Sequence, residues 1–213
     1  MNSKCVRTGL FQTNCYVVED NSASEPFVAV IDPGDDLDLI EAALDTAPSH
    51  IILTHTHFDH VGALMALHTK YPSAKIALGE HENMNPEQVL QEARYVLGSS
   101  FFMAGLKESD FNLPKPDLLL KDGDSIGPYT VLFTPGHSTG SICLYSEQHH
   151  VLYSGDTLFA HSYGRTDING SQSLIIQSVR RLLALDPTTV VYPGHEEATT
   201  IEAERSFFKN YLS

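Results

Sequence analysis

Scarce cysteine and the lack of long apolar runs narrow the classes to which this chain of 213 residues can belong. Its three cysteines, Cys5, Cys15 and Cys143, are odd in number and widely spaced. This argues against a disulfide framework and predicts a reducing compartment, the cytoplasm. No apolar stretch reaches the 18 residues typical of a membrane span, and the N-terminus has no apolar run of signal-peptide length. We therefore expect a soluble, unprocessed protein.

Positive charge is scarce as well. Thirteen Lys and Arg residues stand against 27 Asp and Glu residues, which gives a net charge of −14 at pH 7. A charge of this sign repels the phosphate backbone of nucleic acids and anionic lipid surfaces. We expect neither a nucleic-acid partner nor a membrane partner, and the oligomeric state stays open.

The hydrophobic content of 42% is enough for a buried core, and we expect a single domain over residues 1–213. Short apolar and β-branched runs alternate with stretches whose apolar residues recur every three or four positions, as in strands alternating with amphipathic helices. The expected strands lie at 16–18, 27–31, 50–54, 74–78, 129–134, 141–145, 151–153 and 189–192, and the expected helices near 37–44, 61–68 and 174–183.

The segment at about 86–113 has no strand alternation and is predicted to be a helical insertion. Val89, Ala93 and Val96 recur at helical spacing, and Gly98 marks a break between two helices. Pro114 follows the segment and closes it. Whether this insertion shapes specificity is left open by the sequence.

Histidine is abundant, with eleven residues where average usage predicts roughly half that number. His55, His57, Asp59 and His60 follow an apolar strand and precede a helix. In an extended segment, His55, His57 and Asp59 share one side, and the turn into the helix moves His60 away from them. One cation cannot easily take all four side chains, so the spacing favours two neighbouring cations.

Two metal sites need further ligands, and three later strand ends supply candidates. Each candidate follows a glycine, which allows a turn that directs the next side chain into a cleft. Taken alone, each could be an ordinary turn residue. The three candidates are His137, Asp156 and His195.

Counting ligands tests this set. One ion receives His55, His57 and His137, and the other receives Asp59, His60 and His195. If Asp156 and a hydroxide bridge both ions, each ion has five ligands, a number plausible for catalytic zinc. We predict two divalent metal ions, zinc in the first place, with iron or manganese as further possibilities. The bridging hydroxide would be the nucleophile, and Asp59 and Asp156 would be the catalytic carboxylates beside it.

The pattern His55-x-His57-x-Asp59-His60, followed by His137, Asp156 and His195, resembles the metallo-β-lactamase superfamily over essentially the whole chain. The resemblance implies an α/β fold, an αββα four-layer sandwich of two mixed β-sheets with helices on the outside. It also implies a binuclear metal site at one rim.

Several stretches, including Thr134–Ser141 and Gly164–Asp167, resemble the glyoxalase II-like hydrolases, which hydrolyse thioesters such as S-lactoylglutathione. Glyoxalase II proper has a C-terminal helical extension that helps to hold glutathione, whereas only 18 residues follow His195 here. Family members also tend to read Gly-His-Gly-Pro at the last ligand, where this chain has Glu196 and Glu197. The resemblance therefore supports metal-dependent hydrolysis more strongly than it supports a glutathione thioester as the substrate.

Three residues outside the ligand set have expected roles, each with a plain alternative. Asp32 is predicted to orient a ligand imidazole, or else to initiate the turn at Pro33. By resemblance, Arg165 lies where the glyoxalases keep a basic residue for the substrate carboxylate. Alternatively, Arg165 forms a structural ion pair with Asp167. If it does not, Asp167 is expected to support the metal ligands from behind.

The expected reaction is hydrolysis of a small-molecule thioester or activated ester. A thiolate leaving group has a pKa near ~8.5 and needs little proton donation, unlike an amide nitrogen. Two other functions stay open. A mononuclear iron persulfide dioxygenase would use His55, His137 and Asp156, and a metal-dependent interaction module without catalysis would use the same scaffold.

Overall fold

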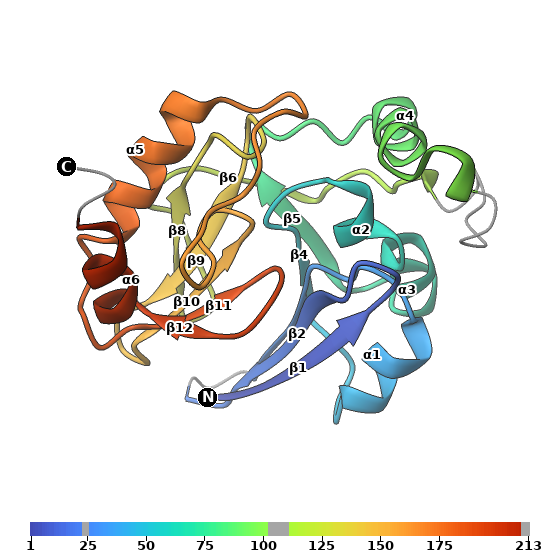
Figure 1. Ribbon diagram of the computed structural model, residues 1–213. Coiled ribbons are helices and arrows are strands. Elements are labelled where there is room, and N and C mark those ends of the chain that lie inside the picture. Colours follow the sequence, from blue (N-terminus) through green and yellow to red (C-terminus); the bar gives the residue numbers. More distant parts are fainter. Residues whose placement is uncertain (23–25, 102–110, 210–213) are drawn as a thin grey trace. The chain divides into compact units, whose positions relative to one another are not determined.

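A computed structural model describes residues 1–22, 26–101 and 111–209 of the chain (Figure 1). The chain divides into two compact units. Unit 1 comprises residues 1–78 and 83–119, and unit 2 comprises residues 79–82 and 120–213. Each unit is built around its own six-stranded sheet.

The sheet of unit 1 is mixed, with the strand order β1-β2-β3-β4-β5-β6. The strands β1, β2 and β3 pair antiparallel, whereas β3, β4 and β5 pair in parallel, as expected where helices connect successive strands. The strands are β1 (Asn2–Thr8), β2 (Thr13–Asp20), β3 (Phe27–Ile31), β4 (His50–Ile52), β5 (Lys75–Gly79) and β6 (Leu118–Leu120).

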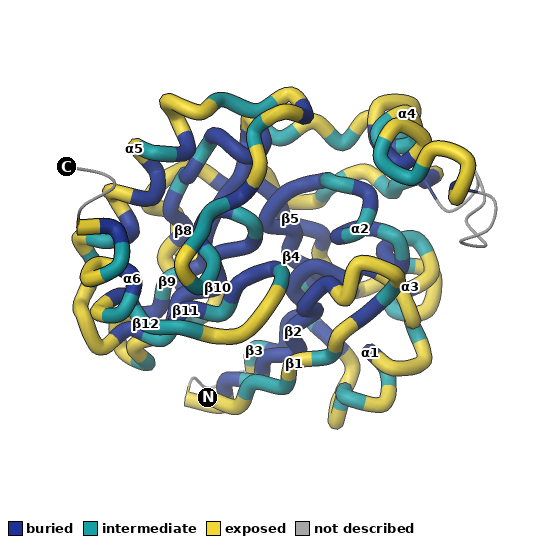
Figure 2. Tube along the Cα trace, viewed as in Figure 1, coloured by how far each residue is buried: buried dark blue, intermediate teal, exposed yellow. Residues whose placement is uncertain are grey.

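Helices pack on this sheet through apolar side chains, and strands β2 to β5 are buried along most of their length (Figure 2). Val30, Ile51 and Ile76 from the strands join Leu64 and Val89 from the helices in one core cluster. The helices are α1 (Leu37–Ala43), α2 (Phe58–Val61), α3 (Leu64–Lys70), α4 (Pro86–Leu97) and the short 3-10 helix η1 (Gly98–Ser100).

The helical insertion expected at about 86–113 is represented by α4 and η1. Asn85 caps α4 by accepting a hydrogen bond from the Glu87 amide, and Pro86 occupies the first turn, where its missing N–H costs nothing. The predicted break falls at Gly98, which ends α4 with a φ of 52°. Residues 102–110 of the expected insertion lie outside the described part of the chain.

Unit 2 contains the second mixed sheet, in the order β12-β11-β10-β9-β8-β7. Its strands pair antiparallel except for β10 and β11, which are parallel. Helix α5 follows β10 and forms the crossover between these two strands. The strands are β7 (Ser125–Ile126), β8 (Tyr129–Phe133), β9 (Ile142–Ser146), β10 (Val151–Gly155), β11 (Val190–Pro193) and β12 (Thr199–Thr200).

Two helices, α5 (Gln172–Leu182) and α6 (Ile201–Phe208), pack on this second sheet. Ser171 and Thr200 cap these helices, because each side chain accepts a hydrogen bond from a backbone amide of the first turn. None of the helices in the described part of the chain combines the length and apolar character that a membrane span requires.

None of the three cysteines forms a disulfide. Cys5 is exposed on β1, whereas Cys15 and Cys143 are buried. Burial raises the pKa of the Cys15 thiol well above its usual value of 9.0, and the nearby carboxylate of Asp32 adds to the shift.

Candidate metal centre

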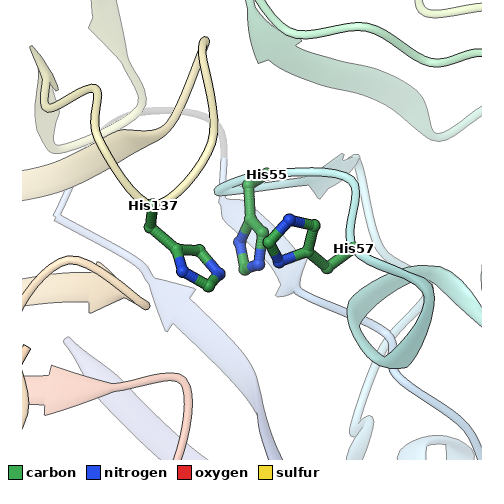
Figure 3. Close-up of side chains that lie close together, drawn as sticks. All are labelled: His55, His57 and His137. Atoms are coloured by element: carbon green, nitrogen blue, oxygen red, sulfur yellow. The ribbon is translucent and has the colours of Figure 1, made fainter. Parts of the chain in front are cut away.

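The loop that follows β4 carries the first group of predicted ligands in unit 1. His55 is fully buried, and its ring lies 4.6 Å from the ring of His57 and 4.1 Å from that of His60, measured between centroids. The first two of these side chains lie close together in the close-up (Figure 3). Three imidazoles packed this densely in a buried position indicate a metal site rather than a solvent-exposed histidine tract.

Helix α2 begins within the same motif and supplies the remaining ligands of unit 1. The Oδ2 atom of Asp59 lies 3.8 Å from Nε2 of His60. Ligand atoms that each lie about 2.1 Å from one zinc ion are about 3 to 4 Å from one another, so this spacing suits a shared ion. The hydroxyl of Thr13 donates a hydrogen bond of 3.2 Å to the same Asp59 oxygen and so fixes the carboxylate from the side of β2.

Asp32 lies behind these ligands and is nearly completely buried. Its carboxylate accepts hydrogen bonds from the Thr54 amide at 2.7 Å and the Thr54 hydroxyl at 2.6 Å, and it lies 3.1 Å from Nδ1 of His60. A contact of this kind orients a ligand imidazole and directs its other nitrogen to the ion. The backbone of Asp32 has a φ of 53°, an uncommon conformation that indicates a functional constraint.

The second group of predicted ligands belongs to unit 2 and follows β8, β10 and β11. One carboxylate oxygen, Oδ2 of Asp156, lies 3.5 Å from Nε2 of His137 and 3.6 Å from Nε2 of His195. An oxygen equidistant from two imidazoles can share one ion with each of them, as a bridging carboxylate does. The other nitrogen of His137 donates to the backbone carbonyl of Arg165 at 2.8 Å, which leaves Nε2 as the coordinating atom. His137 is seen at the end of its loop in Figure 3.

Gly164 allows the segment before Arg165 to approach these ligands. A Cβ atom at this position would lie 2.0 Å from the backbone oxygen of Asp156 and 2.8 Å from Nδ1 of His137. Neither neighbour can give way, because one is backbone and the other is a held ligand ring.

We therefore expect Gly164→Ala to destabilise the protein by about 2 kcal/mol or more and to lower its metal content, because the segment must move away from the ligands. Urea unfolding and metal analysis measure the two effects. Gly123→Ala is the comparison, since the added methyl group would meet no atom within 4 Å and only the φ of 84° opposes the change. Equal losses in both variants would contradict the steric argument.

Glu82, which no sequence pattern indicated, contacts the loop that carries His137. Its Oε2 accepts hydrogen bonds from the Ser138 hydroxyl at 2.5 Å and the Gly140 amide at 3.0 Å. The Ser138 hydroxyl also lies 2.6 Å from that of Ser141. This network fixes the backbone on the C-terminal side of His137, and no spacing in the sequence connects residue 82 with it.

Replacing Glu82 with alanine is expected to lower metal affinity about tenfold, because the loop that positions His137 loses two charge-assisted hydrogen bonds. Equilibrium competition with a chromogenic chelator measures the affinity. Glu80→Ala, two residues earlier and partly exposed, removes the same charge and is expected to leave the affinity unchanged. A matching decrease in both variants would show a general charge effect instead.

Arg165 and Asp167 form a bidentate ion pair on the surface of unit 2. The guanidinium donates to both carboxylate oxygens, at 2.7 and 2.5 Å. Hydrogen bonds from Arg165 lower the pKa of Asp167 to about 2. Both side chains are more than half exposed, so this pair adds little to stability. This geometry is that of a structural ion pair between Arg165 and Asp167. The backbone carbonyl of Arg165 has a separate role, because it accepts a hydrogen bond from the ring of His137.

Glu196 directly follows the last predicted ligand and has a φ of 66°. Glycine adopts this conformation without strain, whereas for another residue it costs about 1 kcal/mol. This positive φ explains why members of the similar family tend to have a glycine at this position. Glu197, the next residue, is exposed.

The comparisons with known proteins agree with this description. The profile of the Metallo-beta-lactamase superfamily matches residues 8–195. The chain belongs to this superfamily, whose fold of two mixed sheets with helices is the predicted fold class and is confirmed. Its members bind divalent metals, and the histidine and carboxylate groups of this chain fit that chemistry.

Three similar proteins bear on the function. The probable metallo-hydrolase YqgX of Bacillus subtilis is 33% identical, with 92% of this chain and 91% of YqgX aligned. The hydroxyacylglutathione hydrolase GloC of Haemophilus influenzae is 32% identical over 96% of this chain and 95% of its own length. Among solved structures, TTHA1623 in a di-iron-bound form has a TM-score of 0.79 and 34% identity, covering 94% of this chain and 96% of the other.

Proposed function

We propose that this protein is a binuclear metallohydrolase that cleaves small thioesters of the hydroxyacylglutathione type. The observation that carries the proposal is the position of Asp156, whose Oδ2 lies within 3.6 Å of two ligand imidazoles. The similarity to GloC supports the substrate class, and the di-iron form of TTHA1623 supports a pair of ions.

The proposed centre holds two ions through seven side chains. His55, His57 and His137 would hold one ion. Asp59, His60 and His195 would hold the other, and Asp156 would be shared by both. Imidazole nitrogen and carboxylate oxygen are ligands that zinc and iron share, so this donor set fits either metal, and we propose zinc as the first candidate.

The chain's own groups prepare this centre for an acyl substrate. When bound, the two ions lower the pKa of a water molecule toward about 7 and polarise the carbonyl of the substrate. Five neutral imidazoles and two carboxylates against four positive charges leave the site positive by two, which favours anionic or carbonyl groups. Thr13 and Asp32 contact Asp59 and His60 and so orient both ligands before a substrate binds.

The leaving group needs little help in this reaction. A thiol has a pKa near ~8.5, so the thiolate departs without full proton transfer from an acid. Arg165, already paired with Asp167, is proposed as a contact for a substrate carboxylate. Three cysteines without disulfides are typical of a reducing compartment, and we propose the cytoplasm as the location.

The decisive experiment combines metal analysis with two assays on protein purified without added metal. We expect about two ions per chain and hydrolysis of both S-lactoylglutathione and a simple chromogenic thioester. One iron per chain, with oxygen uptake on a persulfide substrate, would instead identify a dioxygenase. Two ions without turnover of either thioester would contradict the proposed substrate class and leave the metal centre intact.

A further inference from the structure

Glu92 is an acidic residue on the buried side of α4. It lies three positions after Val89 and one before Ala93, both of which are buried in the core. Its side chain is only 10% exposed. Because a carboxylate on the apolar face of a helix is costly to bury, a charge at this position calls for a specific counterpart.

The imidazole of His57 is such a counterpart. Its Nε2 lies 3.8 Å from Oε1 of Glu92, and the His57 side chain is itself only 12% exposed. A carboxylate near Nε2 favours the tautomer that carries the proton on that nitrogen. The lone pair of the ring is then on Nδ1, the nitrogen that remains for an ion.

Three other ligand imidazoles, those of His55, His60 and His137, show the same arrangement. His55 has Nδ1 at 3.0 Å from the hydroxyl of Thr54, and His60 has Nδ1 at 3.1 Å from Asp32. His137 has Nδ1 at 2.8 Å from a backbone carbonyl. In each case one nitrogen is held by a protein group, and Glu92 is the group in the corresponding position for His57.

Helix α4 is also attached to the ligand loop at its N-terminal side. The hydroxyl of Thr56 donates a hydrogen bond of 3.0 Å to the carbonyl of Asn83, just before the helix. The next residues lead into the Asn85 cap, so the start of α4 has a fixed position relative to the loop. Helix α4 and the residues just before it thus contact the ligand motif at two adjacent residues, Thr56 and His57.

We propose that Glu92 is a positioning residue for the metal centre: its carboxylate holds Nε2 of His57 and directs Nδ1 to the ion. This inference rests on the metal centre of the proposed function and is independent of the substrate. It gives α4 a role in metal binding, because the helix brings an acidic group to a ligand that comes from a different element.

The test is the zinc affinity of metal-free protein, measured by competition with a chromogenic chelator, in Glu92→Ala and Glu92→Gln. Outer-shell partners typically change metal affinity by about 10–100-fold, so we expect a loss of this size for one of the two ions in Glu92→Ala. Glu92→Gln keeps an acceptor oxygen and is expected to lie between Glu92→Ala and wild type. Glu87→Ala, on the exposed side of the same helix, removes the same charge and is the control.

Two further readouts separate positioning from a purely structural role. The visible spectrum of the cobalt-substituted protein should change in Glu92→Ala, and the unfolding midpoint in EDTA should not decrease, since a buried carboxylate has been removed. An unchanged zinc affinity in Glu92→Ala, with or without a lower midpoint in EDTA, would overturn the inference. If wild type itself bound no zinc, the proposed metal centre would fail and this inference with it; absence of thioester hydrolysis with normal zinc binding would affect only the proposed substrate.

Discussion

Replacing Asp156 with alanine is expected to reduce thioester turnover by about a thousandfold or more, since loss of the bridging ligand removes roughly 4 kcal/mol of transition-state stabilisation. Its Oδ2 lies between the imidazoles of His137 and His195, so both ions lose a ligand at once. Steady-state kinetics and metal analysis of the same preparation measure the two effects. We expect the metal content to decrease for both sites.

Asp59→Ala is the informative comparison for this variant. Asp59 is assigned to one ion only, so its removal should lower the metal content from two ions to one and abolish most turnover while the protein stays folded. Circular dichroism checks the fold. Retention of two ions in Asp59→Ala would show that the ligand assignment is wrong, and normal turnover in Asp156→Ala would contradict the bridging role.

The second large effect is expected for Asp32→Ala. The change leaves the buried amide and hydroxyl of Thr54 and the ring N–H of His60 without their acceptor. Each such loss costs on the order of 1 kcal/mol or more, and alanine at a φ of 53° adds about 1 kcal/mol. We expect the free energy of unfolding of the metal-free protein to decrease by about 3 kcal/mol or more, measured by urea denaturation.

Asp32→Asn separates the hydrogen bonds from the charge. Asparagine tolerates the left-handed backbone conformation, and its amide oxygen can still accept the bond from the Thr54 amide. We expect a loss of stability of about half that of the alanine variant, together with weaker metal binding, because the amide group cannot hold His60 as a carboxylate does. Equal stability of wild type and Asp32→Ala would show that Asp32 only initiates the turn at Pro33 and does not hold Thr54 and His60.

Sequence patterns predicted most of the central strands because these have continuous apolar runs. The expected strand at 27–31 coincides with β3, and that at 129–134 extends one residue beyond β8. Strand β1 was missed because it is mostly polar and only Thr8 is buried, and its strand conformation comes from pairing with β2. Helix α6 was missed because Glu204, a fully buried acidic residue, interrupts its apolar side.

The candidate ligands could be identified because each group follows an apolar strand, and His137, Asp156 and His195 each come directly after a glycine that allows a turn. Their supporting residues could not. Glu82 contacts Ser138 from 56 positions away, and Glu92 contacts His57 from 35 positions away. Acidic residues at these positions look like ordinary surface charges in the sequence. Only the packing of α4 and of the segment after β5 brings them to the ligands.

The distribution of cysteines has a practical consequence for following this protein in solution. Thiol reagents react with the thiolate, and a buried thiol with a raised pKa reacts slowly. Cys5, exposed on β1 opposite Tyr16, is therefore the position at which a maleimide dye should attach at neutral pH. A fluorescent reporter can thus be placed on the wild-type chain without mutagenesis, while the buried Cys15 stays unmodified.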